Sequence, residues 1–251
     1  ENLEEEHICC AISSNKDCQV ASKKAWLLKR FDDGLVFKKG DVRGKCFIEY
    51  IPAEKAWCPI KAEGYMYINC FWVSGRYKGQ GNSNLLLEEC IKDSKEKGKK
   101  GLVVLSSKKK KPYLSDPEFL RYKGFKLADT LESYFELLYL PFDEDSIKPS
   151  FNDNVKRSTV ENEGFVLYYS HQCPFTAKYV PIIEEVANSK GIKFKSVLFE
   201  TYEEAQNSPC PFTTYALFYN GDFVTHEILN KNRFEKIVDK LVQQRSEGNV
   251  Y

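Results

Sequence analysis

Three glycines lie close together where an extended apolar segment changes into a helical one. The segment reads Val73-Ser74-Gly75-Arg76-Tyr77-Lys78-Gly79-Gln80-Gly81-Asn82-Ser83, and Asn84-Leu85-Leu86 follow it. Glycine lets the backbone turn sharply and approach a ligand, so successive amides can point at one anion, and the following helix adds its positive end. The pattern suits a pyrophosphate group. An ordinary strand-to-helix loop is the plainer alternative.

Cys173 is a second candidate, because it stands directly before a helical pattern that opens with Pro174. A proline fits the first helical position, since its missing N–H would have no partner there. The unpaired amides of a helix N-terminus favour a thiolate over a thiol. We therefore expect the pKa of Cys173 to lie below the ~8.5 of a free cysteine, and its alkylation at neutral pH to be fast.

Glu49 is a third candidate, because the run Phe47-Ile48-Glu49-Tyr50-Ile51 places a carboxylate inside an apolar extended segment. A carboxylate buried in this way often has a raised pKa, which suits a proton acceptor. Strand alternation equally allows Glu49 to point to water from an edge strand.

Hydrophobic periodicity predicts the elements that position these residues. In the first part of the chain we expect a short strand at 7–13, a helix at 18–31 and extended segments at 35–39, 45–51 and 65–73. A helix at 84–97 follows the glycine loop directly. Strands at 101–105 and 133–140 complete this part.

A polar stretch from Pro141 to Val160, with two prolines and no sustained period, is interpreted as a linker, placed at residues 143–163. After it the pattern becomes strand 165–169, helix 174–190, strand 194–199, a short helix at 202–207, strands 215–219 and 222–225, and a helix at 232–243. The sequence thus predicts two domains, 1–142 and 164–251.

Composition excludes several classes of function. The 251 residues carry 37 Lys and Arg against 36 Asp and Glu, a net charge of +1, which is too balanced for non-specific nucleic-acid binding. Nine cysteines without paired Cys-x-x-Cys spacing, and only three histidines, predict no metal site. Free cysteines in this number indicate a reducing, cytoplasmic compartment.

No apolar run approaches the ~18 residues that a membrane span needs. The acidic start, Glu1-Asn2-Leu3-Glu4-Glu5-Glu6, is not a secretory signal, although the missing initiator Met leaves room for a trimmed leader. We therefore expect no membrane partner.

The glycine loop lacks the Gly-Lys-Ser/Thr of a P-loop and the Gly-x-Gly-x-x-Gly of a Rossmann fold. It resembles the acetyl-CoA loop of the GNAT-superfamily N-acetyltransferases, Gln/Arg-x-x-Gly-x-Gly/Ala. Residues 76–81 fit that pattern letter for letter. Residues 78–83 keep the family's spacing from Val73 and from Leu85-Leu86, and we prefer this register. The resemblance covers roughly residues 7–142 and implies an α/β (α+β) fold with a mixed, mostly antiparallel sheet and flanking helices.

The same resemblance implies acetyl-CoA as co-substrate and gives roles to individual residues. The amides near Phe71, Trp72 and Val73 would pair with the pantetheine arm. The pyrophosphate would lie against Lys78, Gly79, Gln80, Gly81, Asn82 and Ser83. Acetyl transfer needs a base and an acid, and Glu49 is the candidate base. The family's acidic Tyr position is Leu120 here, which leaves Tyr122 as the candidate acid and Tyr113 as another, unless both are packing or surface residues.

The second part resembles the thioredoxin-like fold, in which a strand–Cys-x-x-Cys–helix unit carries a proline eight residues past its first Cys, here Pro181. Thr176 replaces the second Cys, so the motif cannot form its own disulfide. Cys210 lies in the loop that faces the active Cys in that fold, which makes a Cys173–Cys210 pair conceivable.

The whole order of parts resembles bacterial two-domain proteins with a C-terminal YoaP-like module. It predicts an acetyl-CoA-dependent N-acetyltransferase acting on a small-molecule or amine acceptor, with the oligomeric state open. The alternative is a thiol-redox or binding protein that uses Cys173, with the first domain as a scaffold.

Overall fold

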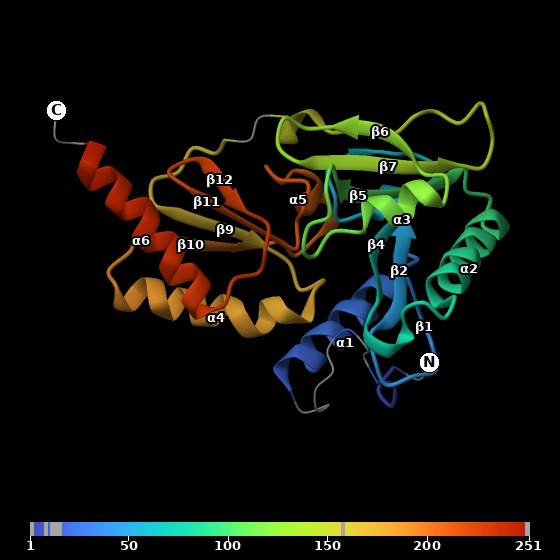
Figure 1. Cartoon of the computed structure of the whole chain (residues 1–251), viewed down its shortest axis with the longest axis horizontal. Coiled ribbons are helices and arrows are strands. Elements are labelled where there is room, and N and C mark those ends of the chain that lie inside the picture. The colour runs from blue at the N-terminus through green and yellow to red at the C-terminus, as the bar shows by residue number, and fades with distance from the viewer. Residues whose placement is uncertain (1–2, 8–9, 11–16, 157–158, 249–251) are drawn as a thin grey trace.

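The computed structural model describes residues 3–7, 10, 17–156 and 159–248, and its two larger sheets lie side by side (Figure 1). The strand predicted at 7–13 falls mostly outside the described residues. The first unit begins with α1 (Cys18–Phe31), whose N-cap Asp17 accepts a hydrogen bond from the Gln19 amide. This cap, together with Lys29 and Arg30 in the last turn, stabilises both ends of the helix.

The first unit is built on a six-stranded sheet with the order β1-β2-β4-β5-β7-β6. Its strands are β1 (Val36–Lys39), β2 (Cys46–Pro52), β4 (Tyr65–Val73), β5 (Gly101–Ser107), β6 (Lys126–Thr130) and β7 (Phe135–Pro141). Only β4 and β5 pair in parallel, and every other pair in this sheet is antiparallel. The predicted mixed, mostly antiparallel sheet is confirmed.

Besides α1, the first unit contains helices α2 and α3. Helix α2 (Asn82–Glu96) follows the glycine loop and packs on one face of the sheet, and α1 covers the other face (Figure 1). Helix α3 (Pro117–Tyr122) is a short helix capped by Asp116.

The second unit is a four-stranded sheet with the order β10-β9-β11-β12. Its strands are β9 (Phe165–Tyr169), β10 (Phe194–Leu198), β11 (Tyr215–Tyr219) and β12 (Asp222–Thr225), and its helices are α4 (Pro174–Ser189), α5 (Tyr202–Gln206) and α6 (Lys231–Gly248). Strand β9 pairs in parallel with β10 and antiparallel with β11.

The predicted linker is more ordered than its composition suggests. Within it, β8 (Ser150–Phe151) pairs with β3 (Ile60–Lys61), and a 3-10 helix covers Asp153–Val155. Phe151 and Val155 are buried. The segment therefore packs against the first unit instead of crossing solvent, although the division into 1–142 and 164–251 stays a prediction.

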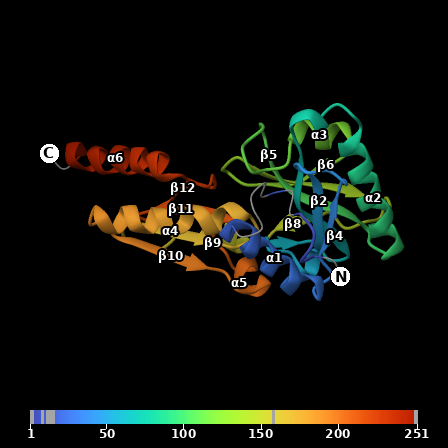
Figure 2. The same ribbon diagram turned by 90° about the horizontal axis from the view of Figure 1, so that it is seen from below.

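One cluster of buried apolar residues extends through both units, from Leu27 and Phe47 to Leu217 and Phe234. Backbone carbonyls of the first unit also accept hydrogen bonds from the second. Gln206 Nε2 donates to the Ala56 carbonyl at 3.0 Å, and Thr213 Oγ1 donates to that of Trp57. Figure 2 shows α1 at this junction, beside the N-terminal end of α4. The two sheets thus share a core.

His226 is a buried contact between the units and makes stability sensitive to acid. Its Nδ1 lies 2.6 Å from the Tyr134 hydroxyl, and its Nε2 lies 2.9 Å from the Pro112 carbonyl. Burial lowers the pKa of His226 from its ordinary value of 6.5, with Lys111 adding to the shift and Glu227 opposing it. Below that ordinary value the unfolded chain binds a proton that the folded chain does not, so stability falls as the pH falls.

We expect the free energy of unfolding to decrease as the pH falls from about 7 to about 5, and His226→Gln to show a shallower decrease. Glutamine can still donate to the Pro112 carbonyl but does not titrate. Urea unfolding at several pH values measures both slopes. His7 and His171 also have lowered pKa values, so part of the slope will persist in the variant. Equal slopes would contradict the role of His226.

In the part of the chain that the structure describes, no helix is both long and apolar enough to cross a membrane.

Candidate functional site

The glycine loop leaves the N-terminus of α2 open. Gly79 and Gly81 both have left-handed backbones, with φ of 73° and 81°. Gly81 is the N-cap of α2, and among the described residues no side chain caps the first amides of the helix. A Cβ atom at Gly79 or Gly81 would have no atom within 4 Å. The loop therefore presents helix amides to an exposed space, as the anion-binding interpretation requires.

Strand β4 lies next to this loop and separates from its neighbour. Its parallel ladder with β5 ends at the pair Ile68 and Val104, while its ladder with β2 continues to Val73. Phe71, Trp72 and Val73 thus have β2 partners but no β5 partners. A register shift falls between Glu49 and Tyr50 on β2, opposite the point where β4 and β5 part. The residues predicted to meet a pantetheine arm lie on this separated edge.

Glu49 is fully buried, but it is not the isolated carboxylate that the sequence suggested. Its Oε2 accepts a hydrogen bond from Lys23 Nζ in an ion pair, and its Oε1 accepts one from Asn69 Nδ2 at 3.1 Å. The solvent-facing alternative is also wrong, because Glu49 is 0% exposed. Burial opposes the charge on Lys23, but the Glu49 carboxylate beside it outweighs this and raises the pKa of Lys23. Lys23 is therefore held in its charged form.

A loop of the second unit contacts this pair. The Gln172 carbonyl accepts a hydrogen bond from Lys23 Nζ at 2.7 Å, and Gln172 Nε2 donates to the Asn69 carbonyl of β4 at 3.1 Å. Lys23, Asn69 and Gln172 were missed from the sequence. Of these three residues, only Lys23 could have been found from the sequence. It lies three and four residues from Val20 and Leu27 and so shares their face of α1. The loop that contains Gln172 thus links the second unit to β4, close to the point where β4 separates from β5.

Cys173 lies at the expected N-cap of α4, but its thiol is not activated. It makes no side-chain capping bond, and burial raises its pKa to about 11, against the opposing effects of the Phe175 amide and Lys23. The expected lowering was wrong, because the loss of water outweighs the helix N-terminus. His171 does not assist as a cation, since burial and Lys29 lower its pKa. Cys210 is a free, buried thiol beside Cys58, and Cys173 is also free.

Alkylation at neutral pH should therefore label Cys18 before Cys173. Cys18 is exposed at the start of α1, whereas the raised pKa of Cys173 leaves little thiolate. Timed iodoacetamide treatment with peptide mapping measures both rates, and Cys18→Ser removes the fast site as a control. Labelling of Cys173 at the rate of Cys18 would contradict the buried thiol.

The structure separates the two tyrosines considered as acids. Tyr122, at the end of α3, is 83% exposed. Tyr113 is half-buried, and burial together with Cys173 raises its pKa to about 12. Tyr113 therefore lies near Cys173 and keeps its proton at neutral pH. Among the described residues, no group of three or more His, Cys, Asp or Glu side chains could hold a metal ion.

Solved structures with a similar arrangement include a putative GNAT acetyltransferase from Desulfovibrio desulfuricans. It is 18% identical, with a TM-score of 0.37 over 47% of this chain and 77% of that one. The PaiA N-acetyltransferase from Thermoplasma acidophilum, solved in complex with coenzyme A, has the same identity and TM-score over 47% of this chain and 71% of that one.

Sequence comparison identifies a family model and a relative of higher identity. Residues 193–236 match the family model described as YoaP-like. The uncharacterized N-acetyltransferase YoaP of Bacillus subtilis (strain 168) is 44% identical over 242 residues, which cover 96% of each chain. This identity extends over almost the full length of both proteins. The chain therefore belongs to the family of the N-acetyltransferase YoaP.

Proposed function

We propose that the chain transfers the acetyl group of acetyl-CoA to the amine of a small-molecule acceptor, using the open N-terminus of α2 and the separated edge of β4. The uncapped α2 N-terminus carries this proposal. Its first amides, reached through Gly79 and Gly81, form the kind of site that phosphate groups prefer. Lys78 and Arg76 add positive charge beside it.

The proposed cofactor path runs from this loop along β4. Lys78, Gly79, Gln80, Gly81, Asn82 and Ser83 would hold the pyrophosphate. Backbone groups of Phe71, Trp72 and Val73, which have no β5 partners, would pair with the pantetheine arm. An unpaired strand edge is a suitable partner for an extended amide chain. The thioester would then lie near Asn69 and Glu49.

Transfer requires that the attacking amine lose a proton and that the departing CoA thiolate gain one. We assign Glu49 as the proton acceptor, since it is a fully buried carboxylate whose β4 partner, Cys70, lies just past the point where β4 and β5 part. Lys23 stabilises its charged form and Asn69 fixes its orientation. For the acid, Tyr113 is better supported than Tyr122, because Tyr122 is 83% exposed whereas Tyr113 is less exposed and lies near Cys173.

Calorimetric titration with acetyl-CoA tests the proposal, followed by mass spectrometry of a panel of amines, amino acids and aminoglycosides incubated with enzyme and acetyl-CoA. We expect binding at micromolar to millimolar cofactor and the addition of one acetyl group to at least one amine. Absence of binding at millimolar acetyl-CoA would overturn the proposal.

The reaction is then to be repeated with Glu49→Gln, which should lower kcat more than it changes the affinity for acetyl-CoA.

We further propose that the second unit is a thioredoxin-like domain with a binding role. The strand order β10-β9-β11-β12 with a single parallel pair, and the position of Cys173 before α4, support this fold. The raised pKa of Cys173 disfavours the thiol-redox alternative. The domain would instead cover the acceptor side of β4 through Gln172. A cytoplasmic location fits the free thiols of the described cysteines.

A further inference from the structure

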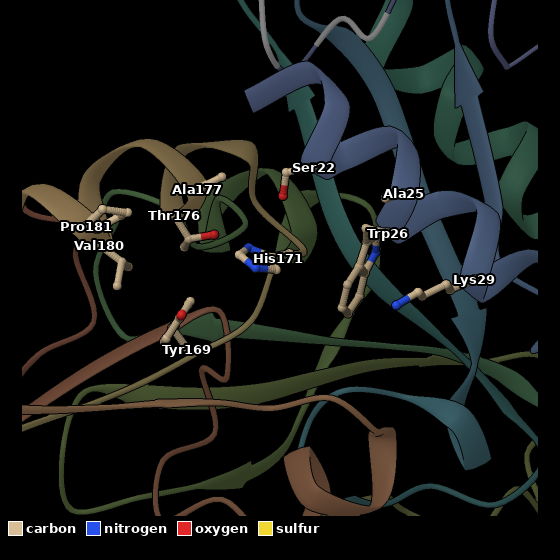
Figure 3. A pocket seen from close by; sticks show the side chains of 10 residues that line it. All are labelled: Ser22, Ala25, Trp26, Lys29, Tyr169, His171, Thr176, Ala177, Val180 and Pro181. Atoms are coloured by element: carbon tan, nitrogen blue, oxygen red, sulfur yellow. The ribbon is translucent and has the colours of Figure 1, made fainter. Parts of the chain in front are cut away.

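A pocket of about 370 Å³ opens between α1 of the first unit and α4 of the second (Figure 3). Ser22, Trp26 and Lys29 line it from one face of α1, where each follows the last by about one helical turn. His171, from the loop before α4, and Ala177 and Val180 of α4 form the opposite wall. The volume falls at the lower end of the range of small-molecule sites, about 300–1,000 Å³. It suits a ligand of one ring with a short chain.

Three residues that line the pocket carry a buried polar atom without a hydrogen-bond partner in the described part of the chain. These atoms are Ser22 Oγ, Trp26 Nε1 and His171 Nδ1. The Trp26 side chain is among the most buried of the lining, at 6% exposure. Figure 3 shows Ser22 and His171 directed toward each other across the pocket. Leaving such a group unpaired is unfavourable, so an occupant that supplies hydrogen-bond partners would be favoured.

The chemistry of the lining selects the kind of occupant. The Trp26 indole N–H and the Lys29 ammonium can only donate hydrogen bonds, and the Ser22 hydroxyl can donate as well. None of the residues lining the pocket is acidic. The Trp26 ring, Ala177 and Val180 give the pocket an apolar side, and Tyr169, His171 and Thr176 also line it. A ligand that complements this wall has hydrogen-bond acceptors and a negative charge at one end and an apolar body at the other.

We propose that this pocket binds a small carboxylate with an aromatic or other apolar body. The carboxylate would face Ser22, Trp26 and Lys29 of α1, and the apolar body would lie against Ala177 and Val180 of α4. The site is separate from the proposed acetyl-CoA site, because α2 packs on the opposite face of the first sheet. The pocket is close to the buried ion pair, since Lys23 Nζ lies 6.0 Å from the centroid of the Trp26 ring, which lines the pocket.

Ligand-observed NMR on the full chain, without acetyl-CoA, tests the proposal with phenylacetate as the probe at up to about 10 mM. The neutral phenylacetamide is the matched ligand. Lys29→Met removes the charge at the pocket, and Lys178→Met removes an exposed charge of α4 that does not line it. Ala177→Phe fills the pocket from α4, and Ala25→Phe fills it from α1. Thermal melts without ligand establish that each variant is folded.

We expect phenylacetate to bind the wild type and Lys178→Met equally, and to bind Lys29→Met at least about fivefold more weakly. Phenylacetamide should bind the wild type and Lys29→Met alike. A folded filled variant should bind neither ligand. Absence of phenylacetate binding, or binding that survives both the charge removal and the filling of the pocket, would overturn the proposal. Because no acetyl-CoA is present, these outcomes are independent of the proposed acetyl transfer.

Discussion

Gly81→Val should weaken acetyl-CoA binding by at least about tenfold, because it acts on the N-cap of α2 in two ways. The residue has a φ of 81°, which a β-branched side chain rarely adopts, so the loop would shift away from its present path. The added side chain would also occupy the open space in front of the helix amides, where no atom lies within 4 Å of the missing Cβ. Calorimetric titration with acetyl-CoA measures the loss.

The matched control is Gly98→Val, which follows the other end of the same helix. Gly98 has a φ of 66°, and its missing Cβ also has no atom within 4 Å. Both substitutions therefore carry a similar backbone strain, and only one of them lies at the proposed phosphate site. We expect both variants to lose some thermal stability, and Gly98→Val to bind acetyl-CoA like the wild type. Equal affinities in two folded variants would show that the loop does not hold the cofactor.

Lys23→Met should lower the free energy of unfolding by about 3–5 kcal/mol, because it leaves the Glu49 carboxylate buried without its cation. Glu49 is 0% exposed and Lys23 is 2% exposed. After the substitution, Asn69 alone would donate a side-chain hydrogen bond to the carboxylate, and the Gln172 carbonyl would lose its lysine partner. Urea unfolding monitored by circular dichroism measures the change.

Two further variants make this prediction specific. Lys38→Met breaks the exposed pair with Glu89 and should change the stability by no more than about 1 kcal/mol. The double variant Lys23→Met, Glu49→Leu removes both buried charges and should regain most of the lost stability. If the double variant is as unstable as Lys23→Met, then lost packing and not the unpaired charge is responsible.

Local sequence signals were sufficient for most of the fold. The predicted strands at 65–73, 165–169, 215–219 and 222–225 have the bounds of β4, β9, β11 and β12, and the predicted helix at 18–31 has those of α1. Strand β6 was missed because it buries only Ala128, so its sequence shows no apolar alternation. Strand β6 pairs with β7, the next strand in the chain, and the short strands β3 and β8 pair with each other although they are far apart in sequence; pairing decides all three strands.

Only part of the candidate site could be predicted from the sequence, because the rest depends on contacts between distant parts of the chain. The glycine loop could be recognised in the sequence, because its conformation depends on consecutive residues. The surroundings of Glu49 and Cys173 are not local. Gln172 contacts Asn69 and Lys23, which are 103 and 149 residues away in the chain. Those contacts determine whether a carboxylate is paired and whether a thiol is exposed.

The contact between Lys23 and Gln172 also has a consequence for synthesis of the chain. Lys23 and Glu49 have both been made by residue 49, but the loop that covers them follows about 120 residues later. At about 5–20 residues per second, the ribosome needs roughly 6–25 s to reach it. During that time the two side chains can stay hydrated, and the charges need not be dehydrated before their partners exist. Closure of the site is thus deferred until translation has passed Gln172.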